Sequence, residues 1–222
     1  MLGNAGTTDF DLRFQLFGIP VRVHPLFWLM AGFIAWIPDR LDLVFVGILC
    51  VFVSILVHEL GHAVTFRRYG HRGEIVLYLM GGYATGGALS TWRNVIVSAA
   101  GPAAGFALAG VVWTVRQALP PEVLRDYHGL WFSINILLFI NIAWGILNLL
   151  PCIPLDGGRI MESLVHRYWP RRAIIKVLWI SILSSGAIAL WGVSRQNRFL
   201  IVLFGILCAQ HVITLNRQKT FR

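Results

Sequence analysis

Long uncharged, mostly apolar stretches alternate with short charged segments along the whole chain. Stretches without Asp, Glu, Lys or Arg cover residues 23–38, 43–57, 94–115, 127–155, 177–194 and 199–216. A transmembrane helix needs about 20 mostly apolar residues, with a range of roughly 17–25. The pattern therefore predicts an all-α polytopic membrane protein with about six transmembrane helices. The motif Ser98-Ala-Ala-Gly101-Pro-Ala-Ala-Gly105 in the third stretch repeats small residues four apart, which predicts close helix packing.

The interval between the second and third stretches has a different pattern. Residues 74–80 read Glu-Ile-Val-Leu-Tyr-Leu-Met, and glycine pairs follow at 81–82 and 86–87. A β-rich run interrupted by glycines predicts a hairpin rather than another helix. We expect a small membrane-associated β-hairpin over Glu74–Ser90, between the second and third spans, with an exposed edge. Because no linker or repeat is visible, we expect a single transmembrane domain over residues 1–222, without a PDZ-like or other regulatory domain.

Composition and charge agree with a membrane protein. Hydrophobic residues make up 57% of the chain and charged residues 13%, and the mean hydropathy is +0.69. With six spans, fourteen of the nineteen Lys and Arg residues fall on the side of the amino terminus, so the positive-inside rule places both termini in the cytoplasm. This topology accounts for the net charge of +9 without a nucleic-acid partner. We expect an integral protein of the plasma (inner) membrane, with no cleavable signal peptide.

The strongest chemical signal is His58-Glu59-Leu-Gly-His62, at the end of the second stretch. Two histidines four residues apart lie on one face of a helix, so both imidazoles can bind one metal ion beside the glutamate. These residues could also be ordinary polar groups at a helix end. Ionisable groups in a transmembrane helix are unfavourable by about 2.5–3.5 kcal/mol each on insertion scales, which favours a metal partner. We predict His58 and His62 as zinc ligands and Glu59 as the catalytic base.

A catalytic zinc ion takes three protein ligands and keeps a fourth position for water. Asp156 is a candidate third ligand because it ends the run Asn148-Leu-Leu-Pro-Cys-Ile-Pro-Leu-Asp156-Gly-Gly, where prolines stop a helix and glycines permit close packing. Two alternatives stay open here: Asp156 caps the next helix, or Cys152 is the ligand. We expect Glu74 and Glu162 to be solvated charges. The remaining candidate histidines have no partner at ligand spacing: His71, His128, His166 and His211.

The HExxH sequence, the Ser98–Pro102 motif and the Asn148–Gly158 run occur in an order that resembles the site-2 protease family of intramembrane zinc metalloproteases. With Gly18-Ile-Pro-Val-Arg-Val-His24-Pro, the resemblance covers nearly the whole chain. It implies that one zinc ion per chain is bound by His58, His62 and Asp156, and that Glu59 is the base. It also implies that Asn148 positions substrate or stabilises the oxyanion, although an interhelical hydrogen bond is an alternative.

The resemblance further implies substrates that are transmembrane proteins, cut within or near their membrane segments to release a signalling factor. A substrate helix must unwind before cleavage, and we expect the edge of the hairpin to pair with the unwound strand. A second class of function is a membrane metal-ion transporter, since histidines and acids also line ion pathways. A third is a non-catalytic membrane scaffold. A transporter predicts polar residues strung along a path, whereas this chain gathers them at one end of a span.

Overall fold

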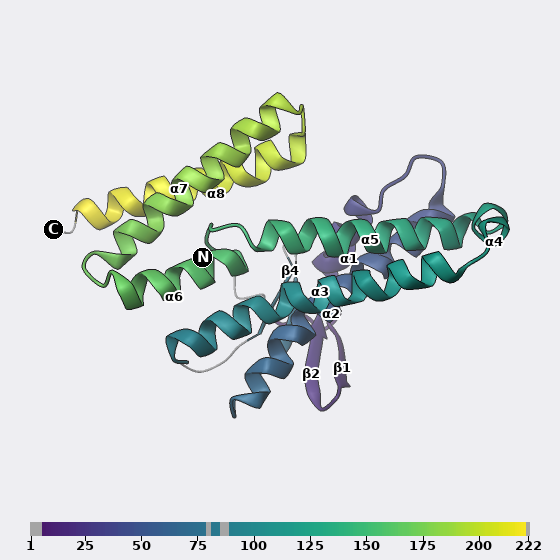
Figure 1. Cartoon of the computed structure of the whole chain (residues 1–222), viewed down its shortest axis with the longest axis horizontal. Helices are drawn as coiled ribbons and strands as arrows, with labels where there is room; N and C mark the ends of the chain where they lie inside the picture. Colours follow the sequence, from purple (N-terminus) through teal and green to yellow (C-terminus); the bar gives the residue numbers. More distant parts are fainter. Residues whose placement is uncertain (1–5, 79–80, 85–88, 221–222) are drawn as a thin grey trace. The chain divides into compact units, whose positions relative to one another are not determined.

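The computed structural model describes residues 6–78, 81–84 and 89–220. Helices dominate, and the elements follow the order β1, β2, α1, α2, β3, β4, then α3 to α8 (Figure 1). The chain divides into two compact units, the first made of Met1–Ala88 and Ala100–Ile146 and the second of Leu89–Ala99 and Leu147–Arg222. The expectation of a single domain over residues 1–222 stays a prediction.

Five of the described helices are long and apolar enough to cross a membrane. They arise from the uncharged stretches after the first, and they confirm a mostly helical polytopic architecture. They are α2 (Leu41–Arg68), α3 (Thr91–Ala118), α5 (His128–Asn148), α7 (Ala173–Ser194) and α8 (Arg198–Thr220). Two shorter helices join them, α4 (Pro121–Asp126) and α6 (Asp156–Tyr168).

The first uncharged stretch forms a shorter helix than expected, α1 (Pro25–Ile34). Ten residues at 1.5 Å each give about 15 Å, half of the roughly 30 Å hydrocarbon core, so α1 alone does not span. The helix begins later than the uncharged stretch because Val23 still belongs to strand β2. His24 then starts the helix as its N-cap: its Nδ1 accepts a hydrogen bond from the Leu26 backbone N–H at 3.1 Å.

The four strands form one sheet in the order β1-β2-β3-β4. Strands β1 (Leu12–Leu16) and β2 (Ile19–Val23) are antiparallel, β2 and β3 (Ile75–Tyr78) are parallel, and β3 and β4 (Gly81–Ala84) are antiparallel. The predicted hairpin between the second and third spans is therefore confirmed in β3 and β4, as half of a larger sheet. The rest of that expected segment, residues 79–80 and 85–88, lies outside the described residues.

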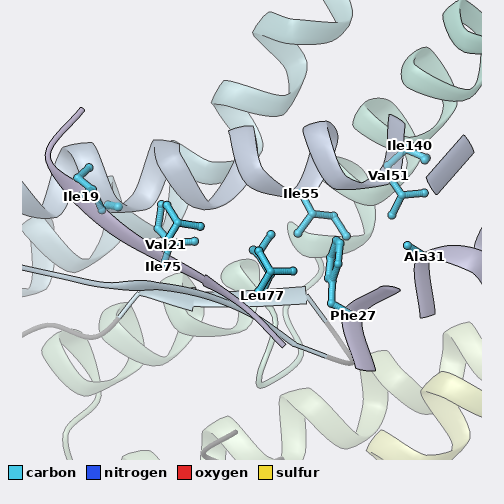
Figure 2. Packing of buried hydrophobic residues seen from close by; sticks show 11 residues of the cluster. Ile19, Val21, Phe27, Ala31, Val51, Ile55, Ile75, Leu77 and Ile140 are labelled. Carbon is cyan, nitrogen blue, oxygen red and sulfur yellow. The ribbon is translucent and has the colours of Figure 1, made fainter. Parts of the chain in front are cut away.

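The sheet packs against α2 in the core of the first unit. Figure 2 shows Ile19, Val21, Ile75 and Leu77 of the sheet in one row of buried side chains with Ile55 of α2. The same cluster continues along α2 to Val51 and includes three further residues from other helices: Phe27 and Ala31 of α1 and Ile140 of α5. Leu60 and Ala63 also belong to it, so the sheet covers the part of α2 that carries the histidine motif.

In the second unit, α7 and α8 lie side by side as a helical hairpin, and α6 packs on α7 (Figure 1). Val165 of α6 is buried against Ala173 and Val177 of α7. The segment between α5 and α6 joins a second cluster of this unit through Cys152, which is completely buried with Phe204 of α8. The residues that lead into Asp156 are thus part of a packed core.

We expect Leu77→Ala to lower the free energy of unfolding by about 2–5 kcal/mol, because it removes a fully buried side chain and leaves a cavity. Leu49→Ala is the matched control, since Leu49 is 59% exposed on the surface of α2. Denaturant unfolding of the detergent-purified protein measures both. Equal losses in the two variants would show that the sheet is not part of the cooperative core.

Candidate metal centre

Helix α2 brings the two predicted histidine ligands together. His58 and His62 lie one helical turn apart, both are buried, and their Nε2 atoms are 3.2 Å apart. Their rings meet edge to face, with centroids separated by 4.9 Å. Glu59, the predicted base, is buried on the same helix. Three ionisable side chains thus occupy one buried turn of an apolar helix.

The separation of the two Nε2 atoms fits a shared metal ion. Zinc binds histidine nitrogen at about 2.0–2.1 Å with tetrahedral geometry, which places two such nitrogens about 3.3–3.4 Å apart. The observed 3.2 Å is close to this value. Coordination through Nε2 uses the neutral tautomer that carries its proton on Nδ1. The pair can therefore supply two of the three protein ligands of a catalytic zinc site.

Two glycines permit the close packing of α2 and α3 around the histidines. A Cβ atom on Gly101 of α3 would overlap Nε2 of His62 and lie 2.8 Å from Nε2 of His58. A Cβ atom on Gly61 of α2 would overlap the backbone carbonyl oxygen of Ala100. The close approach predicted from the small residues of the third span is therefore confirmed at Gly101, and it occurs at the ends of the imidazoles.

A polar contact that sequence reasoning missed lies one turn before His58. Ser54 Oγ accepts a hydrogen bond of 2.9 Å from Asn141 Nδ2 of α5, and both side chains are buried. The Asn141 amide also donates to the carbonyl oxygen of Leu137 at 2.9 Å. The only sequence signal was the four-residue spacing of Ser54 and His58, which puts them on one face of α2. The contact ties α5 to the helix that carries the motif.

Asp156 belongs to the second unit, where it is buried at the first residue of α6. The N-cap of α6 is Leu155, so Asp156 does not occupy the capping position that the alternative interpretation required. The two residues that follow pack directly on the preceding chain: a Cβ atom on Gly157 would overlap the carbonyl oxygen of Leu149, and one on Gly158 that of Cys152. The carboxylate is therefore attached to a tightly packed turn.

The other candidate residues have different environments. Asn148 is buried at the end of α5. Burial raises the pKa of the Cys152 thiol to about 11, which keeps it protonated at neutral pH and disfavours it as a metal ligand. Glu74, which was expected to be a solvated charge, keeps 44% of its side chain exposed and pairs with Arg22 of β2 at 3.4 Å. The ligand role of Asp156 and the role of Asn148 stay predictions.

Comparisons with known proteins place this chain among membrane peptidases. The profile of Peptidase family M50 matches residues 46–126 and 121–190. A zinc metalloprotease of Methanocaldococcus jannaschii is 27% identical over 211 residues, which are 93% of this chain and 57% of that protein. A relative from Synechocystis sp. is 31% identical over 172 residues, 68% of this chain and 43% of that protein.

A solved structure titled as the site-2 protease from M. jannaschii shares the fold. The TM-score is 0.63 at 24% identity, and the match covers 93% of this chain and 95% of that one. The chain spans about half the length of the curated relatives it matches. The family match spans both the histidine motif and the Asp156 turn, and five apolar helices are long enough to cross a bilayer. The chain is thus an integral membrane protein that belongs to peptidase family M50 and has the fold of a site-2 protease.

Proposed function

We propose that this protein is an intramembrane zinc metalloprotease, which hydrolyses peptide bonds within or near the transmembrane segments of other membrane proteins. One observation carries the proposal: the buried Nε2 atoms of His58 and His62 lie 3.2 Å apart in a chain of family M50. The name of the M. jannaschii relative, a zinc metalloprotease, supports the same activity.

Asp156 completes the proposed ligand set of one zinc ion per chain. Two neutral imidazoles and one carboxylate are a donor set that catalytic zinc accepts, and they leave a fourth position for water. The burial of Asp156 and its place outside the N-cap position support this role. Cys152 is not part of the proposed set.

A zinc ion held by these residues would polarise the scissile carbonyl and lower the pKa of the water bound at its open position towards neutrality. The chain's own contribution is proton transfer at Glu59, whose carboxylate oxygen accepts a proton from the attacking water and delivers it to the nitrogen of the leaving amine. Asn148 donates its amide N–H groups to the carbonyl oxygen of the substrate, which holds the peptide and stabilises the developing charge.

A transmembrane substrate must lose helical hydrogen bonds before its carbonyl groups are accessible. We propose that β4 supplies replacements by pairing with the unwound segment. Strand β4 stands at the end of the order β1-β2-β3-β4, and it packs beside α2, the helix of the histidine motif. An extended substrate segment on this edge would lie parallel to the sheet and next to that helix. Substrates are therefore helices that unwind easily.

We propose that both termini and the active site lie on the cytoplasmic side of the plasma (inner) membrane. Although α1 is short, β2 before α1 pairs with β3 after α2. This pairing supports a topology in which the chain before α1 and the chain after α2 lie on the same side of the membrane. Those two strands lie on one side of the bilayer, which also receives Arg13 and Arg67. The excess of Lys and Arg on that side supports its assignment to the cytoplasm.

Glu59→Gln should lower cleavage of a co-expressed transmembrane substrate by about 10²–10⁴-fold, the usual contribution of a general base, while the purified protein keeps its zinc. Asp156→Ala should lose zinc as well as cleavage, whereas Glu162→Gln, an exposed control on α6, should change neither. Gel-based cleavage and metal analysis measure the two effects. Zinc transport by Glu59→Gln, combined with no proteolysis by the wild type, would instead identify a transporter.

Gly101→Ala should weaken zinc binding at least about 10-fold, because the new methyl group would displace the imidazoles of His58 and His62. Gly110→Ala is the matched control on the same helix, since nothing lies within 4 Å of a Cβ atom there. Competition with a chelator measures zinc affinity in both purified variants. The packing argument fails if Gly101→Ala binds zinc as tightly as Gly110→Ala.

Proline substitutions in β4 test the pairing with substrate. Backbone N–H groups of neighbouring residues in a strand point to opposite sides, so one of Gly82→Pro and Tyr83→Pro removes an outward donor and the other a donor to β3. The variant that loses the outward N–H donor should cleave substrate about 10-fold more slowly, with zinc content and unfolding temperature unchanged. Normal cleavage by both variants would exclude β4 as the docking strand.

A further inference from the structure

Two side chains of α7 hold the segment that leads into Asp156. The Ile153 backbone N–H donates to Ser181 Oγ at 3.3 Å, and the Ser184 hydroxyl lies 2.9 Å from the carbonyl oxygen of Pro151. All of these residues belong to the second unit. Ser181 is completely buried. Ser184 lies about one turn further along α7 and is partly buried.

The segment needs such partners because it is not helical. Prolines at positions 151 and 154 interrupt the backbone hydrogen bonding of a helix, which leaves the Pro151 carbonyl and the Ile153 N–H to be paired in apolar surroundings. The Ser184 hydroxyl also lies 2.8 Å from the Ile180 carbonyl oxygen and 3.2 Å from that of Ser181, so its single proton is shared between the segment and its own helix.

The segment transmits its position to Asp156 through close backbone packing. The Cys152 N–H donates to the Leu150 carbonyl at 2.7 Å, and the Leu155 N–H donates to the Cys152 carbonyl at 2.9 Å. On the other side, Gly157 and Gly158 of α6 leave no room for a Cβ atom against this backbone. A shift of Ile153 would therefore displace the first turn of α6, where Asp156 lies.

We propose that Ser181 and Ser184 are positioning residues that fix Asp156 as a metal ligand. They act through the Pro151–Leu155 segment rather than by contact with the metal or the substrate. The inference rests on the proposed function, in which Asp156 binds zinc. Residues that orient a ligand in this way usually change metal affinity or activity by about 10–100-fold when they are removed.

The test measures zinc affinity of the purified full chain by chelator competition. Ser181→Ala and Ser184→Ala should each bind zinc about 10-fold more weakly at temperatures well below unfolding. Ser184→Thr keeps the hydroxyl, so it should bind as the wild type does. This rescue separates positioning from a general loss of packing, and the partly buried Ser184 keeps the test informative if Ser181→Ala does not fold.

A control lies on the same helix. The Ser194 hydroxyl donates to the Trp191 carbonyl within α7, so Ser194→Ala should keep wild-type affinity. Wild-type affinity in the Ser181 and Ser184 variants, with zinc lost in Asp156→Ala, would overturn the inference and leave the proposed function standing. Wild-type affinity in Asp156→Ala would overturn the proposed ligand set, and the inference with it.

Discussion

Two buried imidazole nitrogens 3.2 Å apart impose the main constraint on the first unit. Nitrogen atoms at this distance share either a proton or a cation, and both need the rings to be held against thermal motion. Glycines at the helix contact meet this need, because Gly101 and Gly61 have no side chain and let α3 pack directly against the histidine turn. Ser54 and Asn141 then tie α5 to the same helix by a buried hydrogen bond.

The second unit solves a different problem, which is to hold a carboxylate on irregular backbone among apolar helices. Non-helical backbone at membrane depth needs protein partners for its polar groups. The Pro151–Leu155 segment obtains them from α7 and from its own turn, while its side chains join the core through Cys152. Prolines end the helical hydrogen bonding after α5, and glycines allow the first turn of α6 to pack on the segment. The same interactions that satisfy the backbone also determine the position of Asp156.

The sheet concerns the substrate side of the proposed function. In that proposal extended substrate backbone lies beside the metal, and extended backbone in lipid is stable only if its hydrogen bonds are satisfied. A four-stranded sheet packed on α2 ends in strand β4, next to the helix of the histidine motif. The parallel pairing of β2 with β3 also brings together the chain before α1 and the chain after α2.

The sequence by itself determined the features that depend on neighbouring residues. Apolar runs of sufficient length predicted α2, α3, α5, α7 and α8, and the four-residue spacing of His58 and His62 predicted their convergence, because a helix repeats every 3.6 residues. Only the tertiary structure decided features that join distant segments. The β1-β2 hairpin turns at Phe17 and Gly18, a pair without the usual Asn-Gly signal, and Arg22 of β2 pairs with Glu74, which lies 52 residues later in the sequence. The contact of Ser181 with Ile153 has the same origin: local patterns report periodicity, whereas the partner of a buried polar group is chosen by packing between helices.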